Sequence, residues 1–261
     1  MQVRRFAAPL GAVVEGLDVR AVDDAAWRQL NDLFCEHHVL VFPQQDLQPE
    51  DQMAFAEHWG PLVQFPYGGL DDYPNIIELR NRGKKGDINQ HWHSDMTYNQ
   101  EPPKLTMLYA HEAPEFGGDT AFSNQILAYE NLSSGLRDIL DNLRALHSAE
   151  DLASIYGQDT KAAPRSEHPV VRTHDESGKR ALYVCRAFTH RFVNWSREES
   201  RSLLEFLFQH SIRQEFQARH SWQPGDLVMW DNRCMLHYAV HDHDDQPRVI
   251  HRLQVSGPEP V

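Results

Sequence analysis

Two histidines and a carboxylate stand at alternate positions in QHWHSDMTYN, residues 90–99. If this stretch is a β-strand, His91, His93 and Asp95 project from one face, because successive side chains of a strand point to opposite sides. His93 and Asp95 would then offer an imidazole nitrogen and a carboxylate oxygen to the same point, as ligands of a metal ion. Two ligands do not hold a catalytic metal firmly, so a third has to come from elsewhere in the chain.

The third ligand has several candidates, and the His-x-Asp pair has a simpler explanation. The chain contains 16 histidines, so such a pair arises easily by chance and, taken alone, would be incidental. The candidates in the C-terminal quarter are His237, His241, His243 and His251. His241 and His243 form a rival pair, but the polar, turn-rich stretch HDHDDQP around them predicts a solvated loop.

The segment RVIHRLQV, residues 248–255, is predicted to be the last strand, and its two faces differ. Arg248, Ile250 and Arg252 share one face, while the opposite face is mainly apolar and would pack against a second layer. In a barrel the arginine face points into the cavity, where an unpaired charge is costly. Capture of carboxylates is the natural use of arginine there. The alternative is a pair of surface salt bridges on an exposed strand.

Composition limits the class of protein. The chain has 261 residues, 41% of them hydrophobic, and a formal net charge of −13, which suits a sizeable core and argues against a nucleic-acid partner. Cys35, Cys185 and Cys234 lie far apart, which favours reduced thiols in a cytoplasmic protein. The N-terminal apolar run ends at Glu15 and contains a proline, so it predicts a strand or a strand pair rather than a signal peptide. No stretch approaches the roughly 20 apolar residues of a membrane span.

The elements near the N-terminus alternate between helix and strand. Asp23 and Asp24 precede apolar residues at helical spacing, which predicts a capped helix. Residues 39–42 predict a short buried strand, and Pro49 can open a second helix at its first position.

Short strands dominate the rest of the chain. They are predicted at 76–79, 105–110, 120–124, 169–174, 181–184, 227–232 and 248–255. Two helices interrupt them, at 126–146 and at 197–210, the second behind a capping box at Ser196. The pattern predicts a mainly β protein with flanking helices, a double-sheet barrel or jelly roll, because strands and helices do not alternate as in a doubly wound fold. Residues 80–89 and 149–168 are predicted loops, and the second is long enough for an active-site lid.

An ordered set of motifs resembles one family. The motifs are His93-x-Asp95, GGDT (117–120), HPVVRTH (168–174), WDNRCMLH (230–237), and Arg248 with Arg252. Each is weak alone, but the ordered set is similar to the taurine dioxygenase and 2,4-dichlorophenoxyacetate dioxygenase (TauD/TfdA) family over nearly the whole chain. The resemblance implies a double-stranded β-helix, or jelly roll, forming a single domain, 1–261, with a lid at 149–168. It also implies an Fe(II)- and 2-oxoglutarate-dependent dioxygenase.

The resemblance also answers the question of the third ligand. It implies that His237 joins His93 and Asp95 on iron(II), and that His91 is a neighbour rather than a ligand. Two histidines and one carboxylate on one face of iron(II) leave three positions open, as in non-haem oxygenases. In the implied reaction O2 and 2-oxoglutarate are consumed, a substrate is hydroxylated, and succinate and CO2 are released.

The co-substrate 2-oxoglutarate would fill two of the open positions. The resemblance implies that Arg248 and the hydroxyl of Thr120 bind its far carboxylate and that Trp230 packs beside it. For Trp230 a plain core role on a barrel strand fits the sequence equally well.

Arg252 is the main indication of the substrate. By resemblance it binds a carboxylate or sulfonate, so a small organic anion is expected, with Asn89 and Phe188 on the substrate side. For Phe188, core packing is an almost equal alternative. Phe65 stands in a region where the taurine enzymes carry a histidine, which favours an aryloxyalkanoate or another apolar carboxylate. The alternatives are a taurine-like sulfonate and a natural-product substrate that is hydroxylated or desaturated.

Two other classes remain open from the residues alone. A metal-dependent hydrolase could use the same ligands but would not need Arg248 and Thr120. A non-catalytic β-barrel binding module would keep the cavity without iron. The basic stretch from Arg80 to Lys85 could draw anionic substrates to the site, with a solvated turn as the simpler explanation. By resemblance the expected partner is a small anion, neither nucleic acid nor membrane, and the protein is a cytoplasmic dimer or tetramer.

Overall fold

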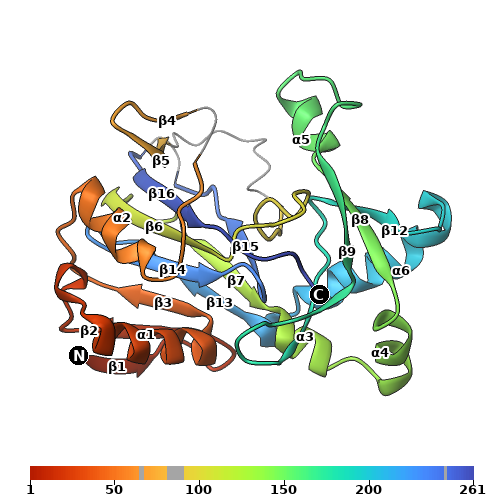
Figure 1. Cartoon of the computed structure of the whole chain (residues 1–261), viewed down its shortest axis with the longest axis horizontal. Helices are drawn as coiled ribbons and strands as arrows, with labels where there is room; N and C mark the ends of the chain where they lie inside the picture. The colour runs from red at the N-terminus through yellow and green to blue at the C-terminus, as the bar shows by residue number, and fades with distance from the viewer. Residues whose placement is uncertain (65–67, 81–90, 244–245) are drawn as a thin grey trace.

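The computed structural model describes residues 1–64, 68–80, 91–243 and 246–261. Within them the chain forms two facing sheets, helices that cover one outer face, and an arm of further strands and helices (Figure 1). The larger sheet has the order β1 (Gln2–Arg5), β2 (Ala12–Glu15), β3 (Val39–Phe42), β14 (Leu227–Asp231), β6 (Leu105–Glu112), β16 (Val249–Val255), β5 (Tyr73–Arg80), β4 (Gly69–Leu70). The smaller sheet has the order β13 (Gln217–His220), β7 (Thr120–Asn124), β15 (Met235–Ala239). This is the jelly roll that the sequence predicts.

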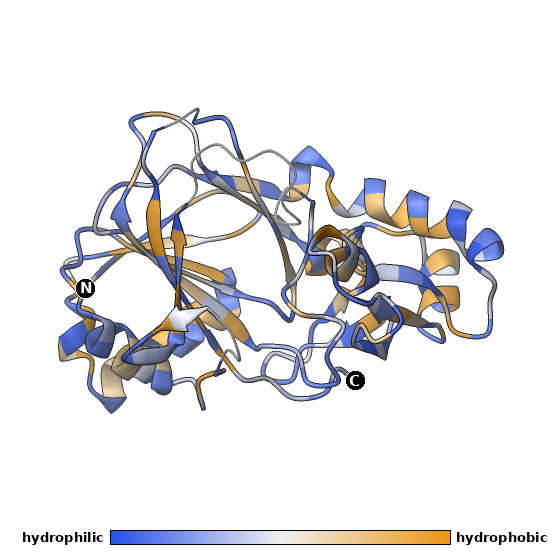
Figure 2. Cartoon of the chain, turned by 90° about the horizontal axis from the view of Figure 1, so that it is seen from above, coloured by the Kyte–Doolittle hydropathy of each residue, from blue (hydrophilic) through white to orange (hydrophobic). Residues whose placement is uncertain are grey.

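Alternation along the strands divides the larger sheet into two faces. On the outer face, Met107 and Met229 pack with residues of α1 (Asp24–His37) and α2 (Pro49–Glu57) into one buried cluster. On the inner face, Val228 and Trp230 pack against Phe122 of the smaller sheet. Hydrophobic residues accordingly colour the strands in the middle of the molecule, and hydrophilic residues the loops (Figure 2). Side chains on the inner face of these strands therefore point toward the smaller sheet.

The arm has a hydrophobic cluster of its own, which includes Phe192 and Leu207. Its strands are β8 (Arg144–Ser148), β9 (Arg165–Pro169) and β12 (Thr189–Phe192) in one sheet, and β10 (Val171–Thr173) with β11 (Arg180–Leu182) in another. Its helices are α3 (Gln125–Glu130), α4 (Ser134–Leu140), α5 (Glu150–Ile155) and α6 (Arg197–Ser211). Two short 3-10 helices, η1 (Val19–Ala21) and η3 (Gln214–Phe216), complete the described elements. In Figure 1 the arm lies on the right, with α5 at its upper end.

Several local predictions are confirmed. The N-terminal segment is a strand pair, β1 antiparallel to β2. The carboxylate of Asp23 accepts hydrogen bonds from the first turn of α1, and Pro49 is the first residue of α2. The hydroxyl of Ser196 and the carboxylate of Glu199 form the predicted capping box of α6. Among the described residues no helix is long and apolar enough to cross a membrane.

Other local predictions are wrong. The helix expected at 126–146 ends at Glu130, because Ser133 caps a separate helix, α4, and the chain from Arg144 pairs as β8. The segment 149–168 is not a structureless loop, since it contains α5 and most of β9. Residues 91–95 do not form a strand; only His93 makes a single bridge, and a turn follows it. His243 is 1% exposed, so it does not lie in a solvated loop.

A buried ion pair secures the connection between β14 and β15. Arg233 is 1% exposed, and its guanidinium donates to both carboxylate oxygens of Asp231, at 2.8 and 2.7 Å. Nε2 of His174 lies 2.8 Å from the same carboxylate. Burial alone would raise the pKa of Asp231, but the charge and hydrogen bonds of Arg233, followed by His174, outweigh it and hold that pKa well below its usual range. This connection sets how Trp230 on β14 and His237 on β15 are placed relative to each other.

We expect Arg233→Met to lower the free energy of unfolding by about 3–5 kcal/mol, because it leaves the Asp231 carboxylate buried without its main partner. Urea unfolding followed by circular dichroism measures the change. Arg213→Met is the matched control, since the Arg213–Glu215 pair has side chains 49% and 63% exposed and should leave the unfolding midpoint unchanged. Equal effects of the two substitutions would contradict a structural role for the buried pair.

Candidate active site

The structure brings His93, Asp95 and His237 together from distant parts of the chain. His93 and His237 face each other across the single bridge, in which each backbone N–H donates to the other residue's carbonyl, at 3.1 and 2.8 Å. All three side chains are buried, and Nε2 of each histidine lies 3.7 Å from Oδ1 of Asp95. Their ligand atoms lie within 4.8 Å of one another, close enough to hold one metal ion. His91 contributes only its backbone to this group.

Both imidazoles are suited to be ligands through Nε2. Nδ1 of His93 lies 2.7 Å from the carbonyl oxygen of His91, and since a carbonyl only accepts, Nδ1 carries a hydrogen, which in the neutral ring leaves the lone pair on Nε2. Burial, followed by the neighbouring His93, holds the pKa of His237 well below its usual range. His237 is therefore neutral at physiological pH, which is the form that binds metals. Two neutral imidazoles and one carboxylate are a donor set that fits iron(II).

A hydrogen-bonded chain orients the Asp95 carboxylate. The hydroxyl of Thr106 accepts hydrogen bonds from the amides of Asn232 and Gln254, at 2.9 and 3.0 Å. Its own hydrogen is thereby directed to Oδ2 of Asp95, 2.6 Å away. The other oxygen, Oδ1, faces the two histidines and also lies 3.0 Å from Nη2 of Arg252. Burial would raise the pKa of Asp95, but the positive charge of Arg252 outweighs it, so that pKa lies well below its usual range.

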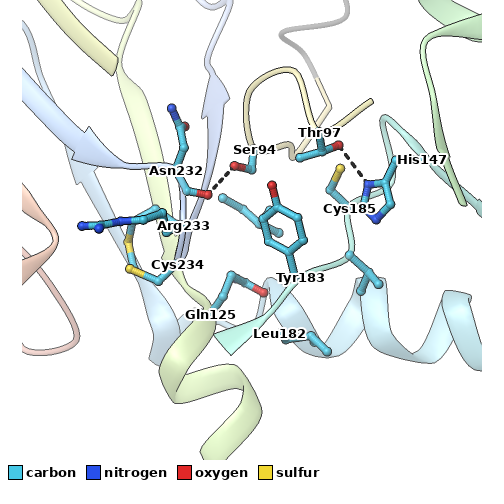
Figure 3. Close-up of a pocket in the computed structure, with 13 residues that line it drawn as sticks. Ser94, Thr97, Gln125, His147, Leu182, Tyr183, Cys185, Asn232, Arg233 and Cys234 are labelled. Carbon is cyan, nitrogen blue, oxygen red and sulfur yellow. Dashed lines mark hydrogen bonds between the residues drawn. The ribbon is translucent and has the colours of Figure 1, made fainter. Parts of the chain in front are cut away.

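Hydrogen bonds of Ser94 and Thr97 also fix the turn that carries Asp95. Figure 3 shows the hydroxyl of Ser94 donating to the carbonyl oxygen of Asn232, at 2.7 Å. On the other side of the same buried pocket, the hydroxyl of Thr97 lies 2.9 Å from Nδ1 of His147 on β8 (Figure 3). The first contact ties the turn to the connection between β14 and β15, and the second ties it to the arm.

A buried guanidinium lies in the same pocket as the Asp95 carboxylate and His237. The pocket is lined by Leu79, Asp95, Leu108, Thr120, Trp230, His237, Ala239, Arg248 and Arg252. Arg248 is 4% exposed, and its Nε donates to the carbonyl oxygen of Gly118 at 3.1 Å. No carboxylate of a described residue forms an ion pair with it, and burial lowers its pKa to about 10. The cost of burying this charge without an ion-pair partner makes it an anion-binding group.

Two aromatic residues shape the anion pocket. Nε1 of Trp222 donates to the hydroxyl oxygen of Thr120 at 3.1 Å, which leaves the hydroxyl hydrogen of Thr120 available to an anion. The Arg248 guanidinium lies over the Trp222 ring, 5.7 Å from its centre. The Trp230 ring lies 4.6 Å from that of His237, and both residues line the pocket that contains Arg248.

The substrate-side residues are described in part. Phe188 is buried and presents its ring at 90° to that of His93, with centres 6.1 Å apart. The Tyr98 ring packs against Phe188 at 5.1 Å. The Arg252 side chain is 19% exposed, so solvent reaches it. Asn89 and Phe65 lie outside the described residues, as does the basic stretch beyond Arg80.

A second group could hold a metal by distance alone, but its charges argue against it. His38, His174, Asp231 and Cys234 are buried with ligand atoms within 4.8 Å of one another. Both oxygens of Asp231 already accept hydrogen bonds from Arg233, whose positive charge opposes a cation there. Burial, the largest effect, raises the pKa of the Cys234 thiol well above its usual range, so the thiolate form of a ligand is disfavoured. This group is a structural ion-pair network.

The structure brings together most of the described residues that the sequence predicts for the site, and it adds neighbours that the sequence did not indicate. The alternative of surface salt bridges for Arg248 and Arg252 is wrong, because both side chains line the pocket. Thr106, Trp222 and Tyr98 were not predicted. Only Trp222 had a local signal, as an aromatic residue in SWQPGD just before a predicted strand.

The geometry of the fold and of this pocket defines a class of protein. A jelly roll that gathers two imidazoles and a carboxylate at one point, with a buried anion-binding guanidinium in the same pocket, has the architecture of a non-haem iron oxygenase. A family model described as "Taurine catabolism dioxygenase TauD, TfdA family" matches residues 2–254. The chain belongs to this family.

Individual relatives agree with the family. An alkylsulfatase of Acinetobacter baylyi is 34% identical over 98% of this chain and 85% of its own length. An (S)-phenoxypropionate/alpha-ketoglutarate-dioxygenase of Sphingobium herbicidovorans is 33% identical over 96% of this chain and 93% of its own length. The crystal structure of a taurine dioxygenase from Burkholderia xenovorans superposes with a TM-score of 0.88 at 32% identity, covering 100% of this chain and 90% of that one. Membership in a dioxygenase family removes the support for the hydrolase and binding-module alternatives.

We expect Thr106→Val to weaken metal binding by about 10–100-fold, because the change removes the hydroxyl that orients Asp95 and keeps the side-chain shape. The measurement is anaerobic titration with Mn(II), followed by the electron paramagnetic resonance signal of the free ion. Thr160→Val, at an exposed position, is the control and should leave the affinity unchanged. An unchanged affinity in Thr106→Val would show that Asp95 is oriented without this hydroxyl.

Proposed function

We propose that this chain is an Fe(II)- and 2-oxoglutarate-dependent dioxygenase whose iron is held by His93, Asp95 and His237. The observation that carries the proposal is the buried Arg248, which has no carboxylate partner among the described residues and opens into the pocket that Asp95 and His237 line. A hydrolase with the same metal ligands has no use for such a group. A dicarboxylate co-substrate that reaches from the metal to Arg248 accounts for it.

The residues that line the pocket have separate roles in this reaction. Arg248 and Thr120 bind the far carboxylate of 2-oxoglutarate, and Trp230 limits the space beside it. Iron(II) with this donor set supplies the redox chemistry that couples decarboxylation of 2-oxoglutarate to hydroxylation of a C–H bond. The balanced reaction converts substrate, 2-oxoglutarate and O2 into hydroxylated substrate, succinate and CO2.

The residues beside the metal ligands favour a substrate with an anionic end and an apolar body. Arg252 supplies a positive charge for the anion, and the Phe188 and Tyr98 rings supply an apolar wall. We propose an aryloxyalkanoate or a similar apolar carboxylate. Hydroxylation beside the ether oxygen gives a hemiacetal, which collapses and releases the phenol. An alkyl sulfate ester is the second candidate, since the relative from Acinetobacter baylyi is named an alkylsulfatase.

We further propose one domain over residues 1–261, with the segment 149–168 as a lid. Leu152 of α5 packs against the cluster that contains Phe188, so this segment adjoins the substrate side. Tyr156, at the end of α5, is 63% exposed and could cover a bound substrate. The cytoplasmic location and the dimeric or tetrameric assembly expected from the family are also proposals.

The test is a substrate panel incubated with Fe(II), 2-oxoglutarate and O2, and scored by succinate. The panel contains phenoxyacetates, 2-phenoxypropionates, hexyl sulfate and taurine. We expect succinate and phenol in equal amounts from the aryloxyalkanoates; aldehyde and sulfate would indicate the sulfate ester, and sulfite the sulfonate. Product formation that persists without O2 would eliminate the dioxygenase.

We expect Arg248→Met to raise the concentration of 2-oxoglutarate needed for half-maximal turnover by at least about 100-fold, because a charge-assisted, buried ion pair is lost. Titration of 2-oxoglutarate at saturating substrate measures this. Arg213→Met removes an exposed arginine that pairs with the exposed Glu215 and should change the value little. Binding of 2-oxoglutarate that is insensitive to Arg248→Met would place the co-substrate elsewhere.

A further inference from the structure

Three nitrogen atoms converge on one oxygen of Asp95. Nε2 of His93 and Nε2 of His237 each lie 3.7 Å from Oδ1, and Nη2 of Arg252 lies 3.0 Å from the same oxygen. The Arg252 side chain is 19% exposed and that of Asp95 is 6% exposed. The guanidinium therefore reaches the buried carboxylate from the side of the pocket that solvent can enter.

A metal ion held by the two histidines and Asp95 has to share Oδ1 with this guanidinium. The Arg252 guanidinium, paired with this oxygen, draws electron density from it, and its fixed positive charge repels a divalent cation at close range in a buried site. An anion that binds Arg252 reduces both effects, because it neutralises the charge and competes for the N–H donors. An anion reduces the repulsion between Arg252 and the metal ion whichever N–H group of the guanidinium it contacts.

We propose that Arg252 couples the metal ion to the substrate: it weakens metal binding at Asp95 until an anionic substrate engages it, so the two ligands bind with positive cooperativity. This inference rests on the proposed function and adds a thermodynamic role to a residue expected only to bind the substrate. By linkage the coupling is reciprocal, and a bound metal strengthens the binding of the anion by the same factor.

The alternative role for Arg252 predicts the opposite result. If Arg252 only positions Asp95, its loss should loosen the carboxylate and weaken metal binding. The second oxygen of Asp95 is held independently by Thr106 at 2.6 Å, so the carboxylate keeps its orientation without Arg252. Removing the positive charge should then strengthen metal binding.

The first experiment compares Mn(II) affinities of the full chain under anaerobic conditions with saturating 2-oxoglutarate. We expect Arg252→Gln, which keeps a hydrogen-bond donor but not the charge, to bind Mn(II) about fivefold or more tightly than the parent. Arg252→Lys keeps the charge and should stay near the parent. Arg213→Gln removes an exposed charge elsewhere and is the control for net charge. An unchanged or weaker affinity in Arg252→Gln overturns the inference.

The second experiment adds an anion or its neutral analogue. We expect phenoxyacetate to tighten Mn(II) binding by about fivefold or more in the parent, and phenoxyacetamide, of similar shape but uncharged, to do so much less. In Arg252→Gln the effect of phenoxyacetate should disappear. Hexyl sulfate and taurine are tested in the same way. An anion that binds without changing the Mn(II) affinity overturns the inference, and if none binds, the first experiment decides alone.

The two experiments distinguish a failure of this inference from a failure of the proposed function. The function fails if His237→Ala and Asp95→Ala leave Mn(II) binding intact, or if no substrate gives succinate. If the parent binds Mn(II) through these residues and forms succinate, while Arg252→Gln shows no gain in affinity, the function stands and the coupling is refuted.

Discussion

The constraint on which the rest of the structure depends is the buried negative charge of Asp95. A carboxylate removed from water is costly unless hydrogen bonds and positive charge compensate it. Here Thr106 donates to one oxygen, and Arg252 and two imidazoles surround the other. Arg252 and Thr106 keep the carboxylate ionised, and an ionised, oriented carboxylate is the condition for holding a divalent metal at neutral pH.

The strand register determines which groups meet this charge. On β16, Arg252 pairs with Leu108 and Gln254 pairs with Thr106 of β6, while Trp230 of β14 pairs with Thr106 from the other side. All of these side chains share the inner face of the sheet, and the alternate residues form the core under α1 and α2. A slip of one residue would turn the site toward the helices and the core toward the pocket. Stability and site geometry are therefore set by the same pairing.

The sequence predicted which residues meet in the fold better than it predicted the elements that carry them. His93, Asp95 and His237 could be chosen because an ordered set of motifs constrains them jointly, whereas the strand expected at 91–95 is a turn with one bridge. The helix expected at 126–146 was too long, because Ser133 caps a second helix and the residues from Arg144 pair with β9 as a strand. Thr106 and Trp222 were missed because a hydroxyl or an indole becomes part of a site only through partners distant in sequence. Tertiary contacts, not local preference, decide such roles.

Arg248 and Arg252 lie in the same pocket but differ in their surroundings. In the proposed function one binds the co-substrate and the other binds the substrate. Arg248 is buried, and no described carboxylate forms an ion pair with it. In the proposed function its only anionic partner is the co-substrate 2-oxoglutarate. Arg252, four residues later, is partly exposed and already in contact with Asp95, so it can respond to whatever anion enters. Relatives named for a phenoxypropionate and for an alkyl sulfate differ in the body of the molecule and share an anionic group. If Arg252 binds the anionic group of the substrate, as we propose, and Phe188 and Tyr98 contact its body, such different acids could be accepted without any change at the metal.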